Sequence, residues 1–179
     1  TDLPRRCTET ARTEPRGDND LVAVIRRMGL GDVEEVLRMR SSLDTLYAVD
    51  RPGPTMTLED LTPLARGPEM HLRVLVAEVE GKVVGFIDYV IPRSPFMPLK
   101  DAVYIGELFV KPEHRRRGLG RALVQRVIQL ARENADKWKA RRVVTNAGDR
   151  AFYERLGFTP MEKPQRETVP MWSHEYLLT

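Results

Sequence analysis

The sequence predicts an α+β domain, in which helices lie on the faces of a mixed β-sheet. Three observations support this class. Residues 71–91 carry two alternating apolar runs around Gly81, as in a β-hairpin. Residues 102–110 are rich in strand-forming side chains, and residues 119–134 have the apolar spacing of an amphipathic helix. Shorter strand and helix patterns flank these segments, and 179 residues suit one domain with a sizeable core.

The first part of the domain is expected to contain a strand and two helices. Residues 22–26 alternate weakly between apolar and polar side chains, which predicts a short strand. Asp32 is placed to cap a helix whose apolar residues recur up to Tyr47. Thr57 is placed to cap a second, shorter helix at residues 57–65.

The rest of the domain continues the alternation of strands and helices. Gly85, inside the second hairpin strand, predicts a bulge or a close packing contact. Residues 91–101 contain three prolines and predict a stiff loop. Asp149 is placed to cap a helix that ends before Gly157. The remaining strands are expected at residues 141–146, from Phe158 onward and at residues 171–178.

Composition limits the class of protein. Residues 1–20 are polar and contain no apolar signal segment, so we expect a disordered arm before a domain at residues 21–179. Cys7 is the only cysteine, so no internal disulfide can form, which is compatible with a cytoplasmic protein. No apolar run approaches the ~18 residues that a membrane-spanning helix needs. The three histidines lack metal-ligand spacing, so no metal site is expected.

The positive charge of the chain is concentrated in one loop. The net charge is +3, and residues 111–117 alone hold four basic residues and one acidic residue. The rest of the chain is therefore close to neutral, which favours a local anion site over a broad nucleic-acid surface. No aromatic residues interleave this basic run, so a nucleic-acid partner is not expected.

This loop connects the strand at residues 102–110 to the following helix. The first N–H groups of a helix have no internal acceptor, and together with the helix dipole they attract an anion such as phosphate. Gly118 and Gly120 let a ligand approach the backbone closely. The third glycine of a dinucleotide fingerprint is missing, and no Gly-Lys-Ser/Thr sequence indicates a Walker loop.

Two segments carry a resemblance to a known family. Residues 115–120, Arg-Arg-Arg-Gly-Leu-Gly, resemble the acyl-CoA-binding motif R/Q-x-x-G-x-G/A of the GNAT acetyltransferase superfamily. Residues 146–158 resemble that family's strand-five exit and fourth helix, with Asn146, Tyr153 seven residues later and a Leu-Gly-Phe ending. The resemblance covers residues 22–178. It implies a three-layer fold with a mostly antiparallel, twisted sheet of six to seven strands and about four helices.

The resemblance implies that acetyl-CoA is the cosubstrate. Its pyrophosphate would bind backbone N–H groups at residues 115–120, and its pantetheine arm would lie along the strand that ends at Val110. The N–H near Phe109 would polarise the thioester carbonyl. The implied cofactor-binding residues are Leu108, Phe109, Val110, Arg115, Arg116, Arg117, Gly118, Leu119, Gly120, Arg121, Asn146 and Tyr153.

Two residues are expected to carry the proton transfers. Tyr153 is the candidate acid that protonates the departing thiolate, since a phenol has an ordinary pKa of about 10. Glu107 is the candidate base that deprotonates the acceptor amine, directly or through a water. For Glu107 an alternative stays open, in which it faces solvent or pairs with an arginine.

The acceptor is less defined than the cosubstrate. Residues 104–110 are similar to segments of polyamine, diamine and aminoglycoside acetyltransferases, which favours a small primary amine. A protein or peptide acceptor is the alternative, and so is a CoA-binding sensor without turnover. The resemblance places acceptor selection in the first two helices and in the loop at residues 91–101. A homodimer that pairs through an edge strand at residues 171–178 is one option for assembly.

Overall fold

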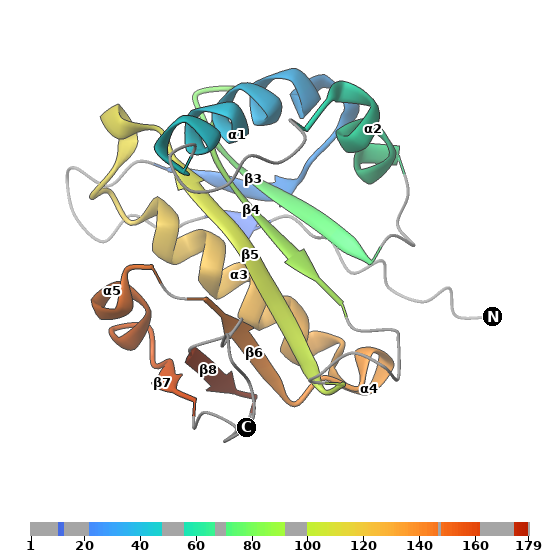
Figure 1. Ribbon diagram of the computed structural model, residues 1–179, viewed down its shortest axis with the longest axis vertical. Helices are drawn as coiled ribbons and strands as arrows, with labels where there is room; N and C mark the ends of the chain where they lie inside the picture. Colours follow the sequence, from blue (N-terminus) through green and yellow to red (C-terminus); the bar gives the residue numbers. More distant parts are fainter. Residues whose placement is uncertain are drawn as a thin grey trace.

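The computed structural model describes residues 11–12, 22–47, 56–66, 71–91, 100–146, 148–161 and 174–178. Eight strands in these segments form one sheet in the order β1-β2-β3-β4-β5-β6-β8-β7 (Figure 1). Strands β5 and β6 run parallel, and the other neighbours run antiparallel. The mixed, mostly antiparallel sheet predicted from the sequence is confirmed.

The central strands are the longest, and the strands at the ends of the sheet are short. The strands are β1 (Ala11–Arg12), β2 (Val24–Arg27), β3 (Leu72–Val79), β4 (Lys82–Val90), β5 (Ala102–Val110), β6 (Arg142–Thr145), β7 (Thr159–Pro160) and β8 (His174–Leu177). The helices are η1 (Leu30–Asp32), α1 (Val33–Tyr47), α2 (Leu58–Arg66), η2 (Pro112–His114), α3 (Leu119–Glu133), α4 (Ala135–Trp138) and α5 (Arg150–Glu154), where η marks a 3-10 helix.

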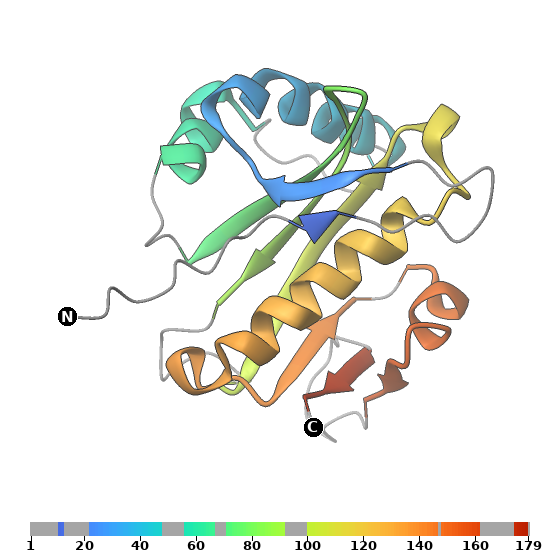
Figure 2. The ribbon, with the colours of Figure 1, turned by 180° about the vertical axis from the view of Figure 1, so that it is seen from behind.

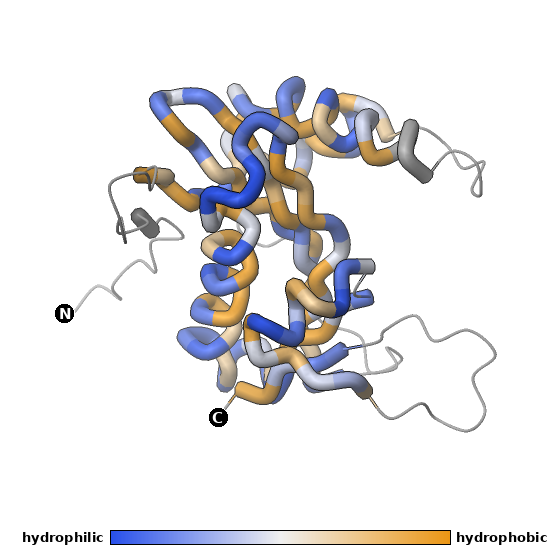
Figure 3. Tube along the Cα trace, turned by 90° about the vertical axis from the view of Figure 1, so that its left-hand side faces the viewer, coloured by the Kyte–Doolittle hydropathy of each residue, from blue (hydrophilic) through white to orange (hydrophobic). Residues whose placement is uncertain are grey.

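Helices cover the two faces of the sheet separately. Leu75 and Ala77 of β3 pack with α3, whereas Val74 and Val76 of the same strand pack with α1 and α2. Side chains alternate between the faces of a strand, so one strand supplies both cores. Helix α3 crosses the face that is seen in Figure 2. In Figure 3 the hydrophilic residues lie on the outer sides of the helices, and hydrophobic residues follow the strands.

The long elements were predicted closely. The expected strand at residues 102–110 is β5, the hairpin is β3 and β4, and the amphipathic helix is α3. A Cβ at Gly85 would lie 2.8 Å from the carbonyl oxygen of Phe109 on β5. The close packing expected at Gly85 is therefore confirmed, because a larger residue would push β4 away from β5.

Local hydrogen bonds explain how the first two helices begin. The Asp32 carboxylate accepts from the N–H of Gly29 at 2.7 Å and pairs with Arg26 at 2.6 Å, which closes the 3-10 turn leading into α1. The Thr57 hydroxyl accepts from the N–H of Asp60 at 3.4 Å, and the Asp60 carboxylate accepts from the N–H of Thr57 at 2.8 Å. This reciprocal capping box fixes the start of α2 one residue after the expected cap.

The structure differs from the sequence-based expectation at three places. Two residues of the N-terminal arm form β1, and the short helix α4 was not expected. Strand β8 is not an edge strand, because β6 pairs with one side of it and β7 with the other. Residues 174–175 are thus not a free edge, and a homodimer stays a prediction. The proline loop lies outside the described residues at 92–99.

Candidate active site

One edge of β5 is open over the C-terminal half of the strand. Strand β6 pairs with β5 only from Ala102 to Ile105, and β6 ends at Thr145. Within the described segments, the pairing of β5 with β6 does not continue beyond Ile105. A strand edge of this kind can pair with an extended ligand through backbone hydrogen bonds.

The direction of the β5 backbone identifies the groups at this edge. The N–H of Glu107 donates to a β4 side chain at 2.7 Å, and the N–H of Lys111 donates to a β4 carbonyl at 2.9 Å. Backbone groups in a strand alternate between its two edges. The N–H groups of Leu108 and Val110 therefore face the open edge.

The N–H of Phe109 does not face the open edge, and its side chain packs in the core. By the same alternation its N–H faces β4, and its ring is 6% exposed and stacks on Phe86 at 6.2 Å. The backbone group next to the open edge is that of Leu108. The carbonyl of Val110 is already an acceptor, because Arg115 Nε donates to it at 2.8 Å.

The start of α3 provides a cluster of backbone donors. Gly118 is the N-cap residue and has φ +79°, a left-handed conformation in which glycine is not strained. No side chain described here caps the helix, and its first turn contains no acidic residue. The first helical bond runs from the N–H of Ala122 to the carbonyl of Gly118 at 2.9 Å. The N–H groups of Leu119, Gly120 and Arg121 therefore lack helical acceptors, which suits an anion.

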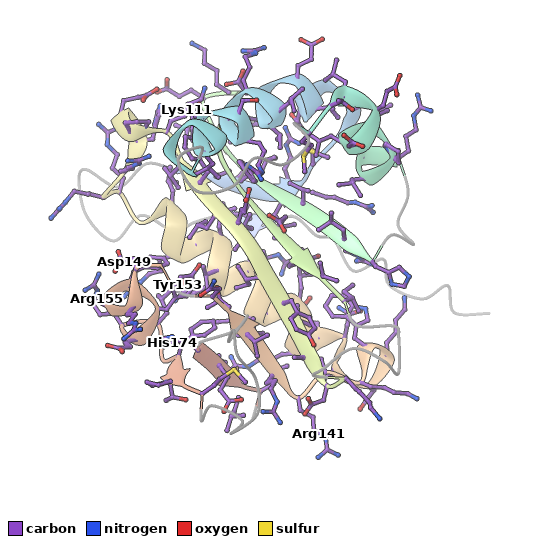
Figure 4. All side chains as sticks on the ribbon, viewed as in Figure 1. Lys111, Arg141, Asp149, Tyr153, Arg155 and His174 are labelled. Carbon is purple, nitrogen blue, oxygen red and sulfur yellow. The ribbon has the colours of Figure 1, made fainter. Side chains whose placement is uncertain are left out.

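The basic residues of the loop have different surroundings. Lys111 Nζ pairs with Glu35 of α1 at 2.7 Å and lies against that helix (Figure 4). The Arg115 guanidinium lies 5.7 Å from the ring centre of Phe109. Both side chains are thus engaged in holding the loop. Arg116, Arg117 and Arg121 are exposed near the helix start, and Arg115 is exposed as well.

Helix α5 lies beside the same helix start. A Cβ at Gly120 would lie 3.5 Å from the Phe152 ring and 3.8 Å from the Leu108 side chain. The beginning of α3 is therefore flanked by α5 and by the open part of β5. Tyr153, the next residue of α5, is 6% exposed and lies between the rings of Phe152 and Phe158, at 5.0 and 5.3 Å.

Asp149 caps α5 as the sequence predicted. Its carboxylate accepts from the N–H of Phe152 at 3.0 Å, and both Asp149 and Tyr153 lie on α5 in Figure 4. Gly157 follows with φ +92°, the left-handed conformation expected after the helix end. Asn146 is exposed at the end of β6, one residue before a position outside the described segments.

A charged cluster lies on the opposite face, below α1. Glu107 of β5 pairs with Arg40 Nε of α1 at 2.5 Å, so the arginine-paired alternative for Glu107 is the one observed. The N–H of Glu107 donates to the Asp88 carboxylate of β4 at 2.7 Å. Sequence reasoning did not select Asp88. A single acidic residue within the apolar strand at residues 83–91 was the available signal, because aspartate is rarely buried.

Burial raises the pKa of Asp88 to about 7 from an ordinary value of 3.8. The hydrogen bond from the N–H of Glu107 opposes this rise, the charge of the Glu107 carboxylate adds to it, and the charge of Arg40 opposes it. The Asp88 carboxylate is therefore partly protonated near neutral pH.

This raised pKa predicts a pH-dependent stability difference for Asp88→Asn. Between pH 4 and 7 the folded state holds a proton that the unfolded state has lost, so wild-type stability falls relative to the variant as pH rises. From pH 4 to above pH 7, the difference in unfolding free energy between the two proteins should change by a few kcal/mol. Each unit by which the pKa of Asp88 is raised contributes about 1.4 kcal/mol. Urea unfolding at pH 5 and pH 8 measures it, and a pH-independent gap would contradict the assigned environment of Asp88.

Comparison with known proteins places these features in a family. The profile of the acetyltransferase (GNAT) family matches residues 38–158, which is more than half of the chain. The chain belongs to the GNAT family. The resemblance seen in the two sequence segments is thus confirmed, and the matched range includes β5, the loop, α3 and α5.

Individual relatives of this GNAT protein agree with that assignment. An uncharacterised N-acetyltransferase of Methanocaldococcus jannaschii is 34% identical over 103 residues, which cover 54% of this chain and 41% of the relative. The L-2,4-diaminobutyric acid acetyltransferase of Nocardia farcinica is 33% identical over 117 residues, which cover 59% of this chain and 48% of the relative. The chain thus spans about half the length of the curated relatives that it matches.

A solved structure supports the GNAT fold independently. The PaiA N-acetyltransferase of Thermoplasma acidophilum, in complex with coenzyme A, superimposes with a TM-score of 0.63. It is 17% identical, and the alignment covers 87% of this chain and 98% of the PaiA chain.

No helix in the described segments is long and apolar enough to cross a bilayer. No group of three potential metal ligands occurs among the same residues.

Proposed function

We propose that this GNAT protein is an N-acetyltransferase that moves an acetyl group from acetyl-CoA directly to a small primary amine. The observation that carries the proposal is the uncapped start of α3 beside the open edge of β5. A Cβ at Gly120 would lie 3.8 Å from the Leu108 side chain, so the proposed phosphate-binding N–H groups and the strand edge are neighbours. The PaiA relative carries coenzyme A in its structure, and coenzyme A has a pyrophosphate and two amides that fit such groups.

Each part of the site would bind one part of acetyl-CoA. The N–H groups of residues 118–121 would bind the pyrophosphate, and exposed Arg116 and Arg117 would balance its charge. The backbone of Leu108 and the N–H of Val110 would bind the amides of the pantetheine arm. Asn146, at the end of β6, borders the point where β6 leaves β5.

The chemistry requires a polarised carbonyl and two proton transfers. Bound acetyl-CoA supplies an acetyl thioester, whose carbonyl carbon is open to attack. The Leu108 N–H at the open edge would donate to the carbonyl oxygen and stabilise the charge that develops there. Tyr153 would give a proton to the departing sulfur.

A small cationic acceptor fits the face below α1. Asp88 and Glu107 provide two carboxylates and Arg40 one guanidinium, so the cluster has a charge of −1 when all three groups are ionised. This charge favours an ammonium group. The Nocardia relative acts on L-2,4-diaminobutyric acid, a small molecule with two amines.

Thiol release from acetyl-CoA, measured with a panel of acceptors, tests this function. The panel contains polyamines, diamino acids, aminoglycosides and peptides. We expect release with small amines and no release without an acceptor. Release with peptides alone would indicate a protein acetyltransferase. Binding of coenzyme A without release for any acceptor would indicate a sensor and overturn the enzymatic proposal.

Tyr153→Phe should lower kcat by roughly 100-fold and leave the Kd for acetyl-CoA within about twofold. The variant keeps the ring between Phe152 and Phe158 and removes only the hydroxyl. Steady-state kinetics and calorimetry measure the two quantities. Tyr176→Phe is a matched control in the same aromatic cluster, 5.5 Å from Phe158, and should keep full activity. Equal kcat for Tyr153→Phe and wild type would remove Tyr153 from the mechanism.

A further inference from the structure

The pairing of β4 with β5 changes register at Asp88. Ile87 pairs with Leu108, but Tyr89 pairs with Ile105. Two residues of β5, Gly106 and Glu107, therefore stand opposite Asp88 alone. This is a β-bulge, a device that redirects side chains and is common beside active sites.

The bulge holds the Asp88 carboxylate in a fixed place. Its Oδ1 accepts the N–H of Glu107 at 2.7 Å. A Cβ at Gly106 would lie only 2.1 Å from its Oδ2, so the absence of a side chain there makes the space for the carboxylate. Asp88 as a whole residue is half-buried, and burial of its carboxylate is the main cause of its raised pKa.

Glu107 is arranged differently. Its carboxylate is engaged by the Arg40 guanidinium at 2.5 Å, a charge-assisted bond that an incoming ammonium would have to break. The Asp88 carboxylate instead accepts the backbone N–H of Glu107 at 2.7 Å, which is a neutral donor. A carboxylate held by a neutral N–H donor is better suited to receive a proton than one bonded directly to a guanidinium.

We propose that Asp88, and not Glu107, takes the proton from the acceptor ammonium, and that Glu107 and Arg40 act as a positioning pair. This inference rests on the proposed acetyl transfer. The carboxylate is bonded to the N–H of Glu107, one residue before the Leu108 N–H that faces the open edge. The proton acceptor and the carbonyl-binding group are thus fixed by adjacent residues of one strand.

The reaction then balances as follows. The acceptor enters as an ammonium ion and gives one proton to the Asp88 carboxylate. The freed nitrogen lone pair forms the N–C bond of the amide while the C–S bond of the thioester breaks. The second proton leaves the nitrogen as the amide forms and returns to the Tyr153 phenolate, which has given its own proton to the departing sulfur. Asp88 finally releases its proton to water, so the net products are an acetamide, a free thiol and one proton.

Electrostatics support this role. The described charged groups that act on Asp88 are Glu107 on β5 and Arg40 on α1, and burial together with Glu107 raises the pKa of Asp88 to about 7. A base works best when its pKa lies near the operating pH. Removing either neighbour should therefore move the pKa of Asp88 in a known direction: downward without Glu107 and upward without Arg40.

The test is the pH profile of kcat/KM for wild type, Asp88→Asn, Glu107→Gln and Arg40→Gln, with the best amine from the panel. For wild type, kcat/KM should fall as the pH drops below about 7, which gives the profile an acidic limb. Asp88→Asn should abolish this limb and lower kcat/KM at pH 8 by roughly 100-fold. Glu107→Gln should keep the limb and move it to lower pH, whereas Arg40→Gln should move it to higher pH. The Kd for acetyl-CoA should stay within about twofold of the wild-type value in all three variants.

The possible outcomes separate the two proposals. If Glu107→Gln abolishes the limb and Asp88→Asn keeps it, Glu107 is the base and the inference is overturned. If Asp88→Asn lowers the rate equally at all pH values with the limb intact, Asp88 is only structural and the inference is also overturned. Both results leave the acetyltransferase proposal standing. If wild type releases no thiol with any amine, the proposed function fails and this inference fails with it.

Discussion

Replacing Gly118 by aspartate should weaken coenzyme A binding by more than about 100-fold while the fold stays intact. A Cβ at Gly118 would meet no atom within 4 Å, so the new side chain has space. Its carboxylate would lie beside the free N–H groups of residues 119–121, where the pyrophosphate is proposed to bind. Two like charges about 5 Å apart repel by roughly 3 kcal/mol at an effective dielectric constant of 20. Calorimetric titration with coenzyme A measures the loss.

Gly118→Asn is the matched control for this experiment. Asparagine has the shape of aspartate, and both residues adopt the left-handed conformation that φ +79° requires more readily than other side chains do. The two variants should have similar Tm values, so the difference in their affinities isolates the charge. Equal affinity of Gly118→Asp and Gly118→Asn for coenzyme A would place the pyrophosphate elsewhere.

Gly106→Ala should lower the free energy of unfolding by roughly 2–3 kcal/mol, an effect typical of overpacking. The added methyl group would lie 2.1 Å from the Asp88 carboxylate, so the bulge or the carboxylate has to shift. In a domain of this size the change lowers Tm by roughly 5–10 °C. Urea unfolding and calorimetry measure both quantities.

A double variant identifies the cause of this loss. In an Asp88→Ala background the obstructing oxygen is gone, and Gly106→Ala should lower the unfolding free energy by less than about 0.5 kcal/mol. Gly31→Ala is a control for the general effect of a methyl group, because a Cβ there meets nothing within 4 Å. An unchanged loss in the Asp88→Ala background would mean that the strain at Gly106 comes from the backbone.

The fold could be predicted from the sequence where the pattern is local and long. The alternation at residues 102–110 and the apolar spacing at residues 119–134 placed β5 and α3 within one residue of their observed bounds. Asp149 could be named as a cap because a capping residue acts on the helix directly after it. The strand β1 and the helix α4 have two and four residues, too few for a periodic signal.

The site could be predicted only in part, because some of its contacts join distant segments. The arginine-glycine loop is contiguous, and its sequence alone indicated an anion site. The pairing of Glu107 with Arg40, 67 positions apart in the chain, depends on how α1 crosses the sheet. The bulge that brings Asp88 to Gly106 depends on the register between two strands, which composition does not encode.

Helix α1 touches both halves of the proposed reaction. Glu35 holds Lys111 at the entrance of the loop proposed to bind coenzyme A, and Arg40, five residues later, holds Glu107 on the face proposed to bind the acceptor. Any redesign or evolutionary drift that changes the acceptor by moving α1 will therefore disturb the coenzyme loop as well, unless both ion pairs are kept. We expect acceptor preference to change mainly through substitutions at exposed positions of α1. Glu35 and Arg40 themselves should be retained together.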